Sequence, residues 1–244
     1  MLKRIINEYT YISTFGRIFR ALKSIDAKPN YIVPLQIASH AEKNPDSIAI
    51  YYEDTEISYK DLIVRSNKYA QWFLNTDLSK GDVVALMMEN RPEFLACWIG
   101  ITQVGGTVAL INTNLTGQAL DYSLNISQSK NLILGKELSG NFSTISEGVK
   151  NNFSTWLQNG EDKSNYFKNL DQILDNMSDS KPEIDYDVSN SDSGLYIYTS
   201  GTTGNPKAAT LSHKRLRLMM LGFKGAIQPR ASDRIYNVLP LYHS

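Results

Sequence analysis

Residues 194–213, GLYIYTSGTTGNPKAATLSH, carry the strongest motif in the sequence. Its apolar, aromatic beginning at residues 195–198 is typical of a buried strand, and the apolar pattern resumes at residues 208–211 as a second strand. Ser212 is suited to cap a helix predicted over residues 214–221. Between the strands lie four hydroxyl side chains and two glycines in six consecutive residues: Thr199, Ser200, Gly201, Thr202, Thr203 and Gly204.

The composition of this loop is suited to phosphate. Glycine lets the backbone fold so that several N–H groups converge on an anion, and the hydroxyls add donors for phosphate oxygens. Pro206 stiffens the exit of the loop, and Lys207 places a point charge beside it. The loop is not a Walker A motif, because Lys207 does not directly follow a glycine and no helix begins there. A solvated turn is the alternative, but the flanking strands and Lys207 favour a polyphosphate site.

Upstream of this unit, strand and helix patterns alternate with short links. Apolar strands are predicted at residues 48–52, 82–88, 107–111 and 131–134. Helices are predicted at residues 35–43, 60–74, 92–104 and 117–127. This alternation predicts an α/β fold, with a mostly parallel sheet and flanking helices. We assign residues 31–135 to a first α/β block on this pattern.

Residues 136–192 have a different composition. Ser, Asn, Asp and Gly dominate, and eleven Asp and Glu stand against four Lys in residues 137–192. Weak helical patches occur at residues 154–157 and 167–174. The pattern predicts a polar, acidic surface segment that interrupts the sheet. A second α/β block, which carries the loop, is predicted at residues 193–244.

Residues 1–30 are predicted to form a basic amphipathic helix. Apolar side chains recur at helical spacing through residues 2–25, and the other face carries Lys3, Arg4, Arg17, Arg20 and Lys23. Such a helix is suited equally to peripheral contact with an anionic membrane and to packing on its own domain. No signal peptide is predicted, because charges recur and no apolar core region forms. No transmembrane segment is predicted either, because the apolar run 94–111 contains Gly105 and Gly106, which divide it into helix and strand.

The overall composition disfavours several classes of function. The 25 Lys and Arg balance the 25 Asp and Glu, and no basic–aromatic pattern favours nucleic acid. The single cysteine, Cys97, excludes an internal disulfide and a Cys-based zinc site, and its apolar neighbours predict a core position. We predict no metal-ligand residues. A lone thiol suits a reducing compartment, so we expect a cytoplasmic location that includes peripheral contact with the cytoplasmic membrane face.

The stretch YTSGTTGNPK, residues 198–207, resembles the signature loop of the adenylate-forming (AMP-binding) superfamily. This superfamily includes acyl-CoA synthetases, adenylation domains of peptide synthetases and luciferases. Three further segments resemble its motifs in the same order: ISYKDL at 57–62, ITQVGGTVALINTN at 101–114 and LPLYHS at 239–244. Other details are similar to the branch of fatty acid transport proteins and very-long-chain acyl-CoA synthetases: ENRPEF at 89–94, ALINTNL at 109–115, and Ala208-Ala209 after the lysine.

The resemblance, which runs from about residue 31 to the end, implies the incomplete N-terminal domain of an acid–thiol ligase. Family members use ATP with Mg²⁺ to convert a carboxylate to acyl-AMP, and CoA thiolate then displaces AMP; the branch implies a fatty acid substrate. By motif matching, residues 199–204 and Lys207 hold the β- and γ-phosphates. Lys207 and His243 are the implied catalytic residues, with His243 near the acyl carboxylate and the CoA entrance. We interpret His40 and His213 as structural.

The family's later motifs, including those for ribose and the C-terminal lysine, have no match in these 244 residues. We therefore expect an N-terminal part of a long-chain fatty acyl-CoA synthetase that is inactive alone, either as a fragment or with a complementing C-terminal chain. The alternative is a non-catalytic remnant, or a lipid-associated binding module, that kept the nucleotide-phosphate loop.

Overall fold

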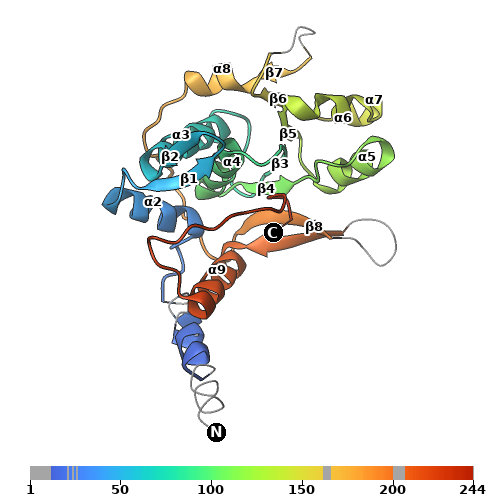
Figure 1. Ribbon diagram of the computed structural model, residues 1–244. Helices are drawn as coiled ribbons and strands as arrows, with labels where there is room; N and C mark the ends of the chain where they lie inside the picture. The colour runs from blue at the N-terminus through green and yellow to red at the C-terminus, as the bar shows by residue number, and fades with distance from the viewer. Residues whose placement is uncertain are drawn as a thin grey trace.

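The computed structural model describes residues 12–20, 22–23, 25, 27–161, 166–199 and 207–243. Within these residues, seven strands form one sheet in the order β7-β6-β5-β3-β4-β8-β9, and two form the separate hairpin β1-β2. Figure 1 shows helices on both faces of the large sheet, with α9 and the N-terminal helix extending away from it.

The strands follow the apolar runs of the sequence. They are β1 (Ile48–Tyr52), β2 (Thr55–Ser58), β3 (Val83–Met87), β4 (Thr107–Leu110), β5 (Asn131–Gly135), β6 (Ser154–Gln158), β7 (Lys168–Asn169), β8 (Ser193–Thr199) and β9 (Lys207–Ser212). In the large sheet all pairings are parallel except that of β8 with β9. The predicted α/β fold with a mostly parallel sheet is confirmed, and the four strands predicted before residue 135 are each found to within one residue at either end.

Beyond the N-terminal helix, the described helices are α2 (Val33–Lys43), α3 (Tyr59–Leu74), α4 (Pro92–Gln103), α5 (Gly117–Ile126), the 3₁₀ turn η1 (Lys136–Leu138), α6 (Ser139–Ser143), α7 (Glu147–Lys150), α8 (Leu170–Asp175) and α9 (His213–Ile227). Helices lie between successive parallel strands, as such connections require: α4 between β3 and β4, α5 between β4 and β5, and α6 and α7 between β5 and β6. A capping box begins α3: the Ser58 hydroxyl accepts from Asp61 N, and the Asp61 carboxylate accepts from Ser58 N.

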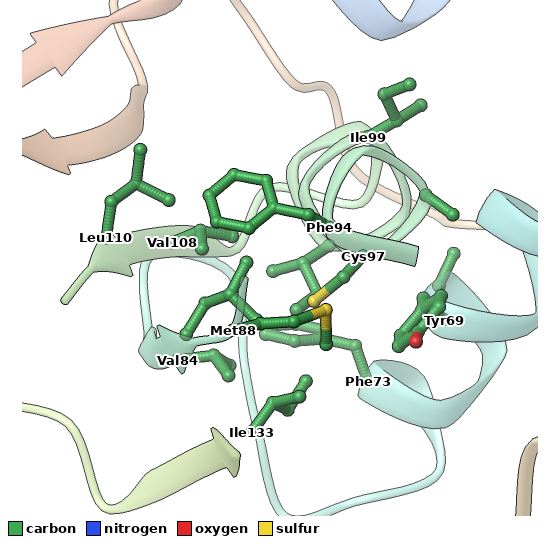
Figure 2. Close-up of a cluster of buried hydrophobic side chains, with 14 of the residues drawn as sticks. Tyr69, Phe73, Val84, Met88, Phe94, Cys97, Ile99, Val108, Leu110 and Ile133 are labelled. Carbon is green, nitrogen blue, oxygen red and sulfur yellow. The ribbon is translucent and has the colours of Figure 1, made fainter. Parts of the chain in front are cut away.

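Two apolar clusters form the core, one on each face of the sheet. Because side chains alternate along a strand, Val84 and Leu86 of β3 enter the cluster under α3, α4 and α8, whereas Ala85 and Met87 enter the cluster under α5 to α7. Figure 2 shows the first cluster, with Cys97 of α4 packed among apolar and aromatic side chains. Cys97 is fully buried and burial raises the pKa of its thiol, so the predicted core position is confirmed.

Helices α3 and α4 approach so closely that only glycine fits at residue 100. A Cβ there would overlap the carbonyl oxygen of Ser66 and lie 2.7 Å from Cβ of Tyr69. We expect Gly100→Ala to lower the free energy of unfolding by about 2–3 kcal/mol, because the two helix backbones must separate. Gly222→Ala in α9 is the matched control, since its Cβ meets nothing within 4 Å. It is expected to raise stability by about 0.5–1 kcal/mol. Urea titration of both variants tests the pair, and equal stabilities would contradict this account of the α3–α4 contact.

The segment 136–192 corrects two expectations. The predicted helical patch at residues 154–157 is wrong: these residues form β6, which is largely buried and pairs in parallel with β5. Thr155 and Trp156 favour a strand, and a run this short does not distinguish helix from strand by periodicity. The segment also does not interrupt the sheet, because β6 and β7 extend it beyond β5 while β8 pairs with β4. The predicted helical patch at 167–174 is confirmed only from Leu170, where α8 begins, because Lys168 and Asn169 form the short strand β7.

The predicted N-terminal helix is present where it is described, at residues 12–20, 22, 23 and 25. It contacts α9: Arg17 Nε donates to the Gly225 carbonyl (3.3 Å), and Ile18 lies so close that a Cβ on Gly225 would approach it to 2.7 Å. The apolar face formed by Ile12, Phe15 and Phe19 is 56–71% exposed. One face therefore packs on its own domain while another is left accessible.

Candidate functional site

The loop that sequence analysis singled out connects β8 to β9. The two strands are antiparallel, with Thr199 opposite Lys207, so the ends of the loop are fixed side by side. Lys207 is exposed at the first position of β9. The loop residues themselves, Ser200, Gly201, Thr202, Thr203, Gly204 and Pro206, lie outside the described residues, as does the side chain of Thr199. The structure thus shows the frame that carries the loop.

The end of β8 and the start of β9, between which the loop lies in the sequence, stand at the carboxyl edge of the parallel sheet. Strand β8 is parallel to β4, which is parallel to β3, which is parallel to β5. The segments that follow all four strands therefore meet at one edge. In open α/β sheets the carboxyl ends of the strands are where ligands bind.

Polar side chains from β3 and β5 are paired at this edge. Arg91, which follows β3, forms an ion pair with Glu137, which follows β5, at 2.8 Å between Nη1 and Oε2. The other carboxylate oxygen of Glu137 accepts from Glu89 N at 3.0 Å. Partial burial alone would raise the pKa of Glu137, but these hydrogen bonds and the Arg91 charge hold it below its ordinary value. The pair joins the ends of two adjacent strands.

His243 lies at the same edge, on a segment that returns to the sheet after a long exposed stretch. Asn90 hydrogen-bonds to Leu239 and Leu241, and Asn114 hydrogen-bonds to Tyr242. The His243 ring is exposed and lies 4.7 Å from the Tyr242 ring, between centroids. The hairpin that carries Lys207 and the segment that carries His243 are thereby assembled at one edge, from parts of the chain that sequence analysis treated separately.

Sequence reasoning did not assign a role to Asn90 or Asn114. Both stand in stretches already quoted for their resemblance, ENRPEF and ALINTNL, and both follow a predicted apolar strand by a few residues. A polar amide just after a buried parallel strand is the signal that could have found them.

Residues 37–244 match the family described as AMP-binding enzyme. The chain belongs to this family. It is 32% identical over 241 residues to human long-chain fatty acid transport protein 6, covering 98% of this chain and 39% of the relative. It is 26% identical over 227 residues to the medium/long-chain-fatty-acid–CoA ligase FadD6 of Mycobacterium tuberculosis, covering 92% of this chain and 37% of the relative. The AMP-binding chain thus spans less than two-fifths of the length of these relatives.

Solved structures show the same fold. The inhibitor-bound N-terminal domain of FACL13 from Mycobacterium tuberculosis is 26% identical, with a TM-score of 0.63, and the match covers 75% of this chain and 44% of that one. The o-succinylbenzoate CoA synthetase of Bacillus subtilis is 22% identical, with a TM-score of 0.70, and the match covers 88% of this chain and 40% of that one. The family resemblance inferred from the sequence motifs is confirmed.

Within this AMP-binding chain, His213 lies just after the β9 strand of the loop hairpin. Its side chain is fully buried against Gly194, and its backbone N–H donates to the carbonyl of Asp192 (3.0 Å). Burial lowers the pKa of the imidazole to about 4, although the Asp192 carboxylate opposes this. Burial tends to raise the pKa of Asp192, but the Ser189 N–H and Lys80, at 2.9 Å, hold it below its ordinary value. These surroundings fit a structural role for His213.

Two buried polar side chains, Asn190 and Arg217, connect the end of the N-terminal helix to the segments that flank the β8–β9 hairpin. Asn190 Nδ2 and Arg217 Nη1 both donate to the carbonyls of Ile25 and Lys28, at 3.0–3.5 Å. Arg217 is 2% exposed and stacks over the Tyr31 ring. The end of the N-terminal helix is therefore anchored beside the start of β8.

Arg217→Ala is expected to lower the free energy of unfolding by about 2–3 kcal/mol, because it empties buried volume and removes two hydrogen bonds. Arg215→Ala, an exposed position on the same helix, is the matched control and is expected to stay within about 0.5 kcal/mol of wild type. Thermal unfolding of both variants gives the comparison. Similar losses in the two would mean that the anchor contributes little.

Among the described residues, no group of three or more His, Cys, Asp and Glu side chains is placed to hold a metal ion. Nor is any described helix both long enough and apolar enough to cross a bilayer.

Proposed function

We propose that this chain forms the ATP-phosphate-binding part of a long-chain fatty acyl-CoA synthetase, an AMP-forming acid–thiol ligase. The observation that carries the proposal is the β8–β9 hairpin, which presents the Ser/Thr/Gly loop at the carboxyl edge of a parallel sheet in a chain of the AMP-binding family. The names of its relatives, long-chain fatty acid transport proteins and a medium/long-chain-fatty-acid–CoA ligase, support a fatty acid as the substrate.

The proposed reaction has two steps. A fatty carboxylate oxygen attacks the α-phosphorus of ATP, a new oxygen–phosphorus bond forms, and pyrophosphate leaves. The CoA thiolate then attacks the acyl carbon, a carbon–sulfur bond forms, and AMP leaves. The first step brings one anion onto a polyanion, so its barrier falls when positive charge and N–H donors surround the phosphates.

Each residue has one role in this proposal. Thr199, Ser200, Gly201, Thr202, Thr203 and Gly204 would hold the β- and γ-phosphates through backbone N–H groups and hydroxyls, and Lys207 would add a charge at the same place. His243 would lie beside the acyl carboxylate and the entrance for CoA. Mg²⁺ would be bound by the phosphates of ATP and enter with it.

The exposed apolar face of the N-terminal helix supports peripheral contact with a membrane. Ile12, Phe15 and Phe19 leave one face of the helix accessible, and Arg20 and Lys23 lie on the same helix. A fatty acid partitions into lipid, so an enzyme held at the cytoplasmic face of a membrane would meet its substrate there. Residues 2–11 of the proposed contact lie outside the described residues.

We expect residues 1–244 on their own to lack acyl-CoA synthetase activity, because no ribose, hinge or C-terminal lysine motif occurs among them. A complementing chain that carries those motifs is the proposed partner. The second candidate function is a non-catalytic, lipid-associated binding module that kept the loop, which the exposed apolar helix face also fits.

Fatty-acid-dependent release of pyrophosphate from ATP tests the proposal. It is measured with and without CoA, for purified residues 1–244 alone and for polypeptides that carry these residues together with the later motifs. Release only when the later motifs are present supports the ligase. Release by residues 1–244 alone would refute the expectation of inactivity, and no release from any of these polypeptides would favour the binding module.

A further inference from the structure

The segment that carries His243 makes an abrupt return from solvent to the core. Its upstream side chains Ile235, Tyr236, Val238 and Leu239 are 59–89% exposed. Three residues later Tyr242 is 4% exposed and belongs to the core cluster. Side chains from the ends of β3 and β4 hold the segment against the sheet at residues 239–242.

Asn90 holds the backbone of the segment from the end of β3. Its Oδ1 accepts from Leu241 N at 2.7 Å, and its Nδ2 donates to the Leu239 carbonyl at 2.9 Å. One side-chain amide thus satisfies a donor and an acceptor two residues apart, as a neighbouring strand would. Because Asn90 lies three residues after β3, the link fixes residues 239–241 to the sheet.

Asn114 holds the same segment from the end of β4. Its Nδ2 donates to the Tyr242 hydroxyl at 2.9 Å. Its own backbone N–H donates to Asn112 Oδ1 at 2.8 Å, which fixes the turn that follows the strand. The segments that follow two adjacent parallel strands therefore each contribute one asparagine that contacts residues 239–242.

These contacts set the position of His243. Its backbone N–H donates to the Pro240 carbonyl at 3.0 Å, within the turn that Asn90 holds, and its ring lies against Tyr242, which Asn114 holds. Since β4 also pairs with β8, the strand that precedes Asn114 supports the strand that leads into the loop. We infer that Asn90 and Asn114 are positioning residues that place His243 at the carboxyl edge of the sheet, beside the strand that leads into the β8–β9 hairpin. This inference rests on the proposed function for the role of His243.

Amide hydrogen exchange on the 244-residue chain tests the geometry without any activity. In Asn90→Leu we expect the Leu241 and His243 amides to exchange at least tenfold faster than in wild type, while the amides of β3 stay within twofold. Asn237→Leu is the matched control, because Asn237 also donates to the Leu239 carbonyl but lies within the exposed stretch and gives no link to the sheet. It is expected to leave the Leu241 amide within twofold of wild type. Unchanged exchange in Asn90→Leu would overturn the inference.

A double-mutant cycle on the Asn114–Tyr242 hydrogen bond distinguishes loss of this one contact from general misfolding. Asn114→Leu and Tyr242→Phe each remove one partner of the same hydrogen bond, so the double variant is expected to expose the His243 amide no more than either single variant. Additive effects would show that the two residues act separately and would overturn the assignment of Asn114.

Kinetics test whether the position of His243 matters. In a polypeptide that carries these residues and releases pyrophosphate, Asn90→Leu is expected to lower kcat roughly tenfold to a hundredfold, with little change in KM for ATP. In a His243→Ala background the same change is expected to have no further effect on kcat. Two results would overturn the positioning role. One is faster amide exchange in Asn90→Leu with an unchanged kcat. The other is an Asn90→Leu change that lowers kcat as much in the His243→Ala background as in wild type. A wild type without pyrophosphate release would refute the proposed function instead, and the exchange data alone would then decide whether the two asparagines hold the segment.

Discussion

Replacing Lys207 with alanine is expected to lower the rate of acyl-adenylate formation at least a hundredfold. Lys207 stands exposed at the first position of β9, directly opposite Thr199, so its charge lies beside the point where β8 ends and the loop begins. Removing one well-placed group that stabilises charge in a transition state typically lowers kcat by 10²–10³. The measurement is fatty-acid-dependent pyrophosphate release by a polypeptide that carries these residues and is active.

Two controls make the Lys207 prediction specific. Lys224→Ala removes an exposed lysine from α9, away from the loop, and is expected to leave the rate within twofold. Sedimentation with anionic vesicles is expected to be the same for Lys207→Ala and wild type, because the proposed membrane contact lies in the N-terminal helix. Equal loss of adenylation and vesicle binding would contradict a phosphate role for Lys207.

Acidification from pH 7 to pH 4 is expected to destabilise the fold through His213. The folded state holds the pKa of this buried imidazole at about 4, whereas an unfolded chain has an ordinary pKa near 6.5. Between these values the unfolded state binds the additional proton, so the stabilisation is complete above pH 6.5 and is lost as the pH falls toward 4. The expected loss from this one group is roughly 3 kcal/mol, from about 1.4 kcal/mol per pKa unit.

His213→Leu isolates this contribution. The leucine keeps an apolar group in the buried site beside Gly194 but cannot take up a proton, so most of the pH dependence between 4 and 6.5 is expected to disappear. His40→Leu is the matched control, since His40 is exposed on α2 and its loss is expected to leave the pH dependence unchanged. Urea unfolding at pH 7, 5.5 and 4.5 measures the three proteins. A His213→Leu variant with the wild-type pH dependence would show that other groups cause the acid sensitivity.

Much of the fold follows from local patterns. The apolar runs at β3, β4 and β5 are short, continuous and separated by segments with helix signals, a combination that few arrangements other than a parallel sheet satisfy. β6 was misassigned because the four residues 154–157, which alternate little in polarity, fit a helix turn as well as a strand. These residues form a strand because they pair with β5, which lies about twenty residues earlier in the chain, and such a pairing leaves no periodic signal in the sequence.

The frame of the candidate site was predictable, but its assembly was not. The loop between the two strands could be found from composition, because glycines, hydroxyls and a lysine between apolar runs favour phosphate binding. The contacts of Asn90 with Leu239 and Leu241 span about 150 residues, and those of Arg217 with Ile25 and Lys28 span about 190. Such pairs depend on how the elements pack, and no spacing within one segment encodes them.

The most direct test of the account is whether the β8–β9 loop binds polyphosphate. Calorimetric titration of the 244-residue chain with Mg²⁺-pyrophosphate and Mg²⁺-ATP is compared between wild type, Lys207→Ala and Lys224→Ala. We expect wild type and Lys224→Ala to bind both ligands with the same affinity, and Lys207→Ala to bind at least tenfold more weakly. Binding by Lys207→Ala that equals wild type, or no binding by a folded wild-type chain, would contradict the assignment of this loop as the phosphate site.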